Sequence, residues 1–321
     1  MCFFFCDTQA QNNNNVTMIR LLGFHNLGEF NLLFFTLLLV IYCMTIFGNL
    51  LIIVLVSYNK TLQSPMYFFL TQLSLTDVLL TTDICPNMLN IVLHEQAAIS
   101  FPGCIIQVYF FGLSETSECL LLTLMSYDRY IAICFPLHYA STMSHGLCIK
   151  LVFSSWLISF AIPVILTLGI CQLQFCGPNI IDHFFCDFNP LVDLSCSDTS
   201  VVLIESTLIC FPVIVLPFLV IVVSYTYIVS SVIKIPSFLG RYKSFSTCSS
   251  HLTVVSIFYG TLIAMYVLPN KGQSHTSAKI LAMLYTVFTP FFNPFIYSLR
   301  NKDIKKALER ICCKQTFVNI K

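Results

Sequence analysis

The chain has 321 residues; 57% of them are hydrophobic, only 10% are charged, and 30 are Phe. A soluble fold of ordinary size cannot bury so many apolar side chains, so this composition excludes a water-soluble globular protein and indicates a chain surrounded largely by lipid. The formal net charge is only +1, and no nucleic-acid partner is expected.

Long apolar runs, taken in chain order, predict membrane-spanning helices. A helix needs about 20 apolar residues to cross the hydrocarbon core, whereas a membrane barrel shows short alternating strands, so these runs favour an all-α integral membrane protein. We expect an extracellular tail at 1–29, a seven-transmembrane helix bundle at 30–299, and a short cytoplasmic amphipathic helix and tail at 300–321. The seven predicted spans are 30–57, 65–92, 101–135, 147–170, 200–235, 245–269 and 277–299.

The distribution of Lys and Arg predicts the orientation of the bundle, because cytoplasmic loops retain positive charge. All but three of the 16 basic residues fall on one face, and the exceptions are Arg20, Lys271 and Lys279. The N-terminus is therefore predicted to be extracellular, in a multi-pass plasma-membrane protein. Asn15 begins an Asn-x-Thr glycosylation sequon on this tail.

The 16 cysteines divide by location. Disulfides need an oxidising compartment, so those near the outer loops are the candidates, and composition alone does not choose the pairing. These candidates are Cys104, at the start of the third span, and Cys171, Cys176, Cys186 and Cys196, around the loop between spans four and five. Cysteines within the spans are expected to pack as small apolar residues. Cys312 and Cys313 follow a basic amphipathic stretch and are either palmitoylated or plain cytosolic thiols.

Three carboxyl groups stand inside predicted spans, where each costs about 2.5 to 3.5 kcal/mol on insertion scales. Asp77 lies mid-way along span two, and Glu115 and Glu118 lie on one side of span three, one turn apart. For Asp77 and Glu118 we favour a shared cation or proton. The alternative is a pair of protonated carboxyls bonded to neighbours, holding the helices in register.

The triplet Asp128-Arg129-Tyr130 ends span three at the cytoplasmic boundary. The arginine can pair with its neighbouring aspartate or with another helix, which makes the triplet a candidate switch; the alternative is an arginine that simply extends to the interface. No phosphate-binding loop or hydrolase signature is present, so an enzyme is not expected. The loop run His183–Asp187 contains metal-ligand residue types, but a disulfide is the favoured interpretation of its cysteine.

Several longer motifs follow one another in a characteristic order. The strongest are the third-span sequence MSYDRYIAIC and the seventh-span sequence PFFNPFIYSLRNK. The others are PMYFFL at 65–70, LSLTD at 73–77, PLHY at 136–139, Ser224-Tyr225, and KSFSTCSSHL at 243–252. Together they resemble the vertebrate olfactory receptors, which are rhodopsin-like, class A G-protein-coupled receptors. The match runs from about Asn15 to Lys306. Gln63 stands where the family usually has a histidine, and Val202-Leu203 replaces a common Asn-Glu pair.

The resemblance implies an odorant receptor that activates a heterotrimeric stimulatory G protein and so raises cyclic AMP. It implies no catalytic residues, and the only cofactor it suggests is an allosteric sodium ion at Asp77, Glu118 and Asn293. The disulfides it implies are Cys104 to Cys186, which would hold the loop over the pocket, and Cys176 to Cys196.

A volatile ligand is small and mostly apolar, so its site should be an enclosed cavity with one or two polar anchors. We expect the outer halves of spans three, five, six and seven to supply this cavity. Glu115 is the main candidate for a polar anchor. As a neutral acid it would donate a hydrogen bond to an oxygenated odorant; as a carboxylate it would pair with an amine. The alternative is that it only bonds Thr116 or water. The predicted lining is Phe111, Gly112, Glu115, Thr116, Ile209, Val213, Tyr259, Leu262, Ile263, Tyr266, Met283 and Thr286.

We expect activation to be a shift between two conformers. Contraction around Tyr259 would let span six swing outward at its cytoplasmic end. Arg129 would then leave Asp128 and meet Tyr225 and the G protein, with Tyr297 moving alongside. The competing class is a transporter or channel, and the lack of an inverted repeat argues against it. A same-family receptor for a non-odorant small molecule outside olfactory tissue stays open as an alternative.

Overall fold

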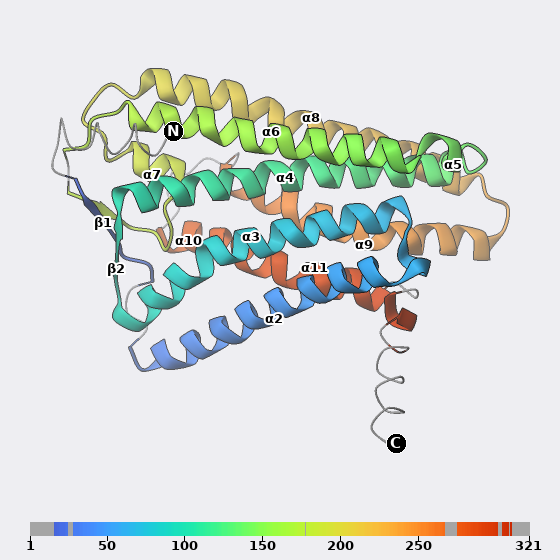
Figure 1. Cartoon of the computed structure of the whole chain (residues 1–321), viewed down its shortest axis with the longest axis horizontal. Helices are drawn as coiled ribbons and strands as arrows, with labels where there is room; N and C mark the ends of the chain where they lie inside the picture. Colours follow the sequence, from blue (N-terminus) through green and yellow to red (C-terminus); the bar gives the residue numbers. More distant parts are fainter. Residues whose placement is uncertain are drawn as a thin grey trace.

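A computed structural model of the chain describes residues 16–24, 28–176, 178–266, 275–300, 304–307 and 309. Within these residues, seven helical segments are long and apolar enough to cross a membrane, which confirms the predicted fold class (Figure 1). Six are the single helices α2 (Asn31–Tyr58), α3 (Pro65–His94), α4 (Phe101–Cys134), α6 (His145–Cys171), α8 (Ser200–Ile233) and α9 (Phe238–Tyr266). The seventh joins α10 (His275–Met283), a π-helical turn (Leu284–Phe288) and α11 (Thr289–Arg300).

Local chemistry accounts for where several helices begin. Ser100 caps α4 by accepting a hydrogen bond from the Gly103 N–H at 3.2 Å, and Ser144 caps α6 by accepting from the Leu147 N–H at 3.4 Å. α3 begins at Pro65, a residue that fits the first helical position because its missing N–H would be unpaired there. α9 begins at Phe238, seven residues before the predicted start at 245, because the helix continues through Arg241 and Lys243, which interrupt the apolar run.

The position of each helix in the bundle follows its polarity. α4 contacts α3, α6, α8 and α9, and 67% of its most apolar window is buried. The corresponding share for α8 is 11%, so most of α8 faces outward. α8 is also the most apolar span and α4 is among the least, as expected when lipid surrounds the bundle and polar groups face inward.

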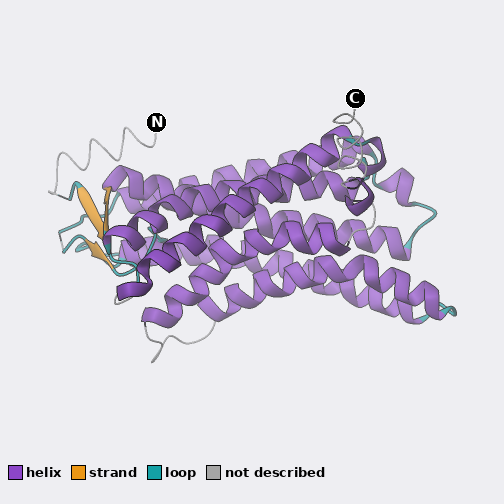
Figure 2. Ribbon diagram, turned by 90° about the horizontal axis from the view of Figure 1, so that it is seen from below, coloured by secondary structure: helices purple, strands orange, loops and turns teal. Residues whose placement is uncertain are grey.

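A three-stranded sheet covers one end of the bundle (Figure 2). β1 (Met18–Leu21) pairs antiparallel with β2 (Ala97–Ser100), which lies between spans two and three. β1 also pairs in parallel with β3 (Ile180–Ile181), in the loop between spans four and five. The segment before the first span is thus part of a structured cover over this end, which the sequence patterns did not predict.

Lys279 of α10 fastens this cover to the seventh span. Its ammonium donates to the backbone carbonyl of Gly23 and to the Asp182 carboxylate, each at 2.5 Å. The lysine side chain is only 5% exposed, so these two bonds replace the hydrogen bonds to water that its buried ammonium has lost. We call the three strands together with Lys279 and Asp182 the outer lid.

At the opposite end lie the short helix α5 (Tyr139–Thr142) and a 3₁₀ turn (Lys60–Leu62). Residues 304–307, in the region predicted as an amphipathic helix, form a helical turn with Ile304 and Ala307 buried. Asn15, Cys312 and Cys313 lie outside the described residues, so the predicted sequon and palmitoylation stay predictions.

Candidate functional site

A cavity of about 380 Å³ lies between α4, α6, α8 and α9, beneath the loop that joins α6 to α8. Its size falls within the range of small-molecule sites, and most of its wall is apolar. α4 contributes one face, because its lining residues recur about every helical turn, at 108, 111–112, 115–116 and 119. The α4 residues are Val108, Phe111, Gly112, Glu115, Thr116 and Cys119; α6 adds Ile162, Pro163 and Leu166; the loop and α7 add Asp187, Phe188 and Asn189; α8 adds Ser206, Thr207, Cys210, Phe211, Val213, Ile214 and Val215; and α9 adds Leu262 and Ile263.

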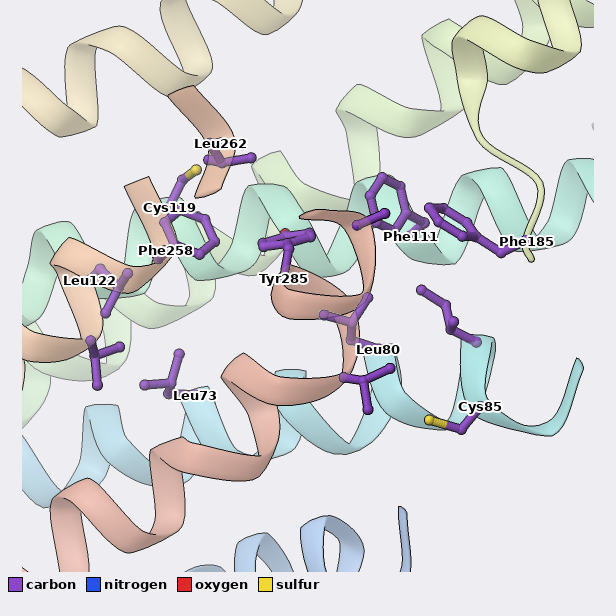
Figure 3. Close-up of a cluster of buried hydrophobic side chains, with 14 of the residues drawn as sticks. Leu73, Leu80, Cys85, Phe111, Cys119, Leu122, Phe185, Phe258, Leu262 and Tyr285 are labelled. Carbon is purple, nitrogen blue, oxygen red and sulfur yellow. The ribbon is translucent and has the colours of Figure 1, made fainter. Parts of the chain in front are cut away.

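A disulfide holds the loop over this cavity. Cys104, near the start of α4, is bonded to Cys186, with the two Cα atoms 5.4 Å apart. Next to it, Phe185 packs on Phe111 with the ring centroids 5.1 Å apart (Figure 3). Gln107 adds a polar bridge: its amide donates to the Asp83 carbonyl of α3 and accepts from the Cys186 N–H, both at 2.8 Å. The loop is therefore tied to α4, and through Gln107 to α3, at the point where it meets the cavity.

The second disulfide shapes the loop itself. Cys176 and Cys196 are bonded, with their Cα atoms 5.9 Å apart. Between them the chain turns inward, and Asp187 caps the short helix α7 (Phe188–Val192) by accepting a hydrogen bond from the Phe188 N–H at 2.7 Å. Burial of Asp187 raises the pKa of its carboxyl to about 6, and the bond from Phe188 opposes this shift. A loop carboxylate thereby becomes part of the cavity wall.

The neighbouring loop histidine, His183, packs among aromatic rings. His183 is stacked against Phe184 and meets Phe185 edge-on, with centroid distances of 4.6 Å for each. Burial, and then the nearby charge of Lys279, lower the pKa of its imidazole to about 4, although Asp182 acts in the opposite direction. In the part of the chain that the structure describes, no three His, Cys, Asp or Glu side chains are placed to hold a metal ion together.

Deeper in the bundle, polar groups gather between α3, α4 and α11. The Asn293 amide donates to both carboxylate oxygens of Asp77, at 3.1 and 3.0 Å. Glu118 is fully buried, and neither of its carboxyl oxygens has a hydrogen-bond partner among the described residues. The buried Ser114 hydroxyl also has no hydrogen-bond partner among the described residues. These oxygen atoms are of the type that coordinates a small hard cation, so the residues present fit such an ion.

Near the C-terminal end of α4, Asp128 forms the centre of a second polar group. It forms an ion pair with Arg129 and also accepts a hydrogen bond from the Tyr139 hydroxyl of α5 at 2.7 Å. The Asp128 side chain is fully buried and that of Arg129 is 11% exposed. The arginine therefore pairs with its neighbour, one of the two arrangements that we expected.

A hydrogen-bonded chain joins α8, α9 and α4 near this end. The Tyr225 hydroxyl lies 2.6 Å from Nδ1 of His251, and Nε2 of His251 lies 3.1 Å from the carbonyl oxygen of Leu122. A carbonyl can only accept, so Nε2 carries the proton and Nδ1 accepts from the tyrosine. All three helices are therefore linked through one buried imidazole.

Comparison with known proteins identifies the family. A family model described as "Olfactory receptor" matches residues 38–315. The rat protein Olfactory receptor 1468 is 45% identical over 305 residues, which cover 95% of this chain and 97% of that receptor. The chain belongs to the olfactory receptor family. The human Olfactory receptor 11A1 is also 45% identical, over 95% of this chain and 96% of its own length.

The solved structure of squid rhodopsin supports the fold of this olfactory receptor. It matches with a TM-score of 0.67 at 18% identity, over 87% of this chain and 85% of rhodopsin. The protein is accordingly a seven-transmembrane G-protein-coupled receptor of the plasma membrane, in a family of receptors and not of enzymes.

The structure places most of the predicted ligand-binding residues of this receptor around the cavity. Those that line it are Phe111, Gly112, Glu115, Thr116, Val213, Leu262 and Ile263. Ile209, Tyr259, Met283 and Thr286 are not in its wall. Tyr259 packs on Phe218, with ring centroids 4.8 Å apart, and the Thr286 hydroxyl donates to the Ala282 carbonyl within its own span. Tyr266 ends α9, and its side chain lies outside the described residues.

The cavity also has a wall that we did not predict. Span four lines it through Ile162, Pro163 and Leu166, whereas we expected span seven in that role. Asp187 was missed because nothing in its sequence surroundings shows that the loop turns inward. His251 was missed as a partner of Tyr225, although an ionisable residue within a span is itself a signal that a polar partner lies nearby.

The remaining predicted switch residues lie in the half of the bundle opposite the three-stranded sheet. Tyr130 packs between Tyr227 and Phe135, with ring centroids 5.8 and 5.6 Å away. Tyr297 is buried, and its hydroxyl has no hydrogen-bond partner among the residues described. Tyr225 is engaged with His251, so it is not the partner of Arg129 in this conformation.

Proposed function

We propose that this receptor binds small volatile organic molecules in the cavity between α4, α6, α8 and α9, and that it activates a heterotrimeric stimulatory G protein to raise cyclic AMP. The observation that carries the proposal is the cavity itself: about 380 Å³, mostly apolar, roofed by a disulfide-anchored loop, with a few polar groups in its wall. An odorant gains free energy there by leaving water, and the polar groups select its orientation.

Coupling from the cavity to the G-protein face runs along α9. Leu262 and Ile263 line the cavity, and His251 lies three turns further along the same unbroken helix. A ligand that draws the outer half of α9 inward, around Tyr259, tilts its inner half away from Tyr225. That movement frees Tyr225 to receive Arg129 from Asp128, with Tyr297 moving alongside. A hundredfold preference of the ligand for the active conformer supplies roughly 2.7 kcal/mol for this change.

The direct test measures cyclic AMP in cells against a broad odorant panel, with surface receptor quantified by an N-terminal tag on intact cells. We expect at least one agonist, and we expect Arg129→Ala to abolish its response at equal surface expression. A full response in Arg129→Ala would refute the switch. Odorant-evoked current in cells that lack the G protein would instead favour a channel. The antibody reaches only extracellular tags on intact cells. A tag that stains in permeabilised cells but not in intact cells would therefore contradict the proposed extracellular N-terminus.

A sodium ion held near Asp77 is part of the same proposal. Asp77, Glu118 and the hydroxyl of Ser114 supply the oxygen atoms, and Asn293 orients the Asp77 carboxylate by donating to both its oxygens. A cation offsets the cost of burying two carboxyl groups that interact electrostatically. Bound in this conformer, it would favour the inactive receptor.

A further inference from the structure

Two carboxyl groups from different parts of the chain face the ligand cavity. Glu115 comes from α4, in the middle of the wall, and Asp187 comes from the loop that covers it. Among the described residues that line the cavity there is no lysine, arginine or histidine. The side chains of this wall that can carry a full charge at neutral pH are thus of one kind: there are two acids and no base.

Neither carboxyl is fully compensated by the protein. Among the described residues, no hydrogen bond reaches the side chain of Glu115, and only the Phe188 N–H bonds Asp187. The two acids also repel each other across the cavity. Lys279 of the lid is bonded to Asp182 and Gly23 and is not in the cavity wall. Negative charge at this site therefore needs a positive partner from outside the chain.

We propose that the preferred ligands of this cavity are small organic amines, bound as ammonium ions between Glu115 and Asp187. The inference rests on the proposed function in taking this cavity as the agonist site, and it deepens that function by naming the ligand class. An aliphatic amine is protonated at neutral pH, as a lysine side chain is. Its ammonium offers three donors to the two carboxylates.

The rest of the cavity suits the apolar body of such a molecule. Val108, Phe111, Ile162 and Leu166 present only carbon atoms to it, so a hydrocarbon chain or ring gains free energy by burial there. An alcohol of the same skeleton keeps this gain but lacks the positive charge, and it has one donor where the ammonium has three. A carboxylic acid, ionised at neutral pH, adds a third negative group and is excluded.

The test compares hexylamine, hexanol and hexanoic acid, and the same three derivatives of cyclohexylmethane, which share a skeleton within each set. Binding is read as the ligand-induced rise in Tm of the purified receptor in nanodiscs, and signalling as cyclic AMP at equal surface expression. We expect the amines to be at least about tenfold more potent than the alcohols in both assays, because one charge-assisted pair distinguishes the two ligands. The acids should be inactive.

Substitutions then assign the effect to the two carboxyls. Glu115→Gln and Asp187→Asn keep the side-chain shapes and should each lower amine potency by about ten- to hundredfold while changing alcohol potency by less than about threefold. Asp193→Asn is the matched control, because Asp193 ends the same short helix α7 but is exposed and does not line the cavity. It should leave all potencies unchanged. If Asp187→Asn fails to reach the surface, Glu115→Gln alone decides.

The outcomes separate this inference from the proposed function. Equal potency of amines and alcohols, or amine potency that survives Glu115→Gln, overturns the inference; alcohol-stimulated cyclic AMP would then leave the odorant function standing. An amine-induced Tm shift that Glu115→Gln removes, without any cyclic AMP, supports the inference and overturns the coupling to a stimulatory G protein. If none of these compounds acts in either assay, the inference is overturned, and the broad odorant panel decides the proposed function separately.

Discussion

The imidazole of His251 offers the sharpest test of how the receptor is held inactive. His251→Phe keeps an aromatic ring of similar size but removes both of its bonds, to Tyr225 of α8 and to the Leu122 carbonyl of α4. An interhelical hydrogen bond in a membrane is worth about 0.6 kcal/mol on average, and buried hydrogen bonds more generally about 1 kcal/mol. Losing two therefore removes about 1 to 2 kcal/mol from the conformer in which they form.

That free energy sets the expected size of the effect. In our mechanism the active conformer has already given up these bonds, so the substitution raises the ratio of active to inactive receptor by about 5- to 30-fold. A resting active fraction on the order of 1% would become about 5 to 25%. The assay is ligand-free cyclic AMP, divided by the amount of receptor stained on intact cells.

Two further variants make the result interpretable. Ser256→Ala removes an exposed hydroxyl that, within the part of the chain that the structure describes, bonds only the Leu252 carbonyl of α9, so it should leave basal activity unchanged. Tyr225→Phe breaks the same bond to His251 but also removes the hydroxyl that Arg129 is expected to meet, so it should not raise basal activity and should weaken the response to agonist. The reasoning is refuted if His251→Phe reaches the surface with the basal activity of Ser256→Ala or less.

Three more predictions concern the lid, the loop acid and the cation site. Lys279→Met removes both bonds that fasten the outer lid, so hydrogen exchange of the β1 and β3 amides should become faster at unchanged exchange in α4; identical protection in the variant would contradict the fastening role. Because burial raises the pKa of Asp187 to about 6, the ligand-free folded receptor binds this proton more tightly than the unfolded chain, whose aspartates have a pKa of about 3.9. The Tm of the purified protein should therefore rise, relative to Asp187→Asn, as the pH falls from 7 to 5, and parallel profiles would exclude the effect. Replacing an organic cation in the buffer by sodium should raise the Tm of the wild type but not of Asp77→Asn, and an equal rise in both would remove the proposed sodium site.

Hydropathy predicts the number and approximate bounds of the spans, because a helix that crosses lipid must be long and apolar. Hydropathy does not predict the parts of helices that lie beyond the apolar runs. α9, for example, begins at Phe238, seven residues before the apolar run that predicted it. The tail strand β1 was missed for a different reason. Its four residues form a strand only because partners about 80 and 160 positions away present free backbone groups, and no local pattern carries that information.

Some residues of the cavity wall could be predicted from the sequence, and others could not. Helical periodicity predicts which face of α4 is turned inward, so Phe111, Glu115 and their neighbours fall in the cavity wall. It does not predict which other helix that face meets, and α6 occupies the place that we assigned to the seventh span. Asp187 reaches the cavity because of a disulfide and a helix cap acting together on an irregular loop. Contacts of that kind depend on the assembled molecule.

The bond between Lys279 and the Gly23 carbonyl joins residues 256 positions apart. During synthesis, the tail leaves the ribosome first and the seventh span last, so the lid stays unfastened for almost the whole of translation. A nascent chain that stalls before its final helix can pair β1 with β2 and β3, but it lacks the lysine that joins them to the bundle. This attachment therefore forms only after the seventh span has been synthesised.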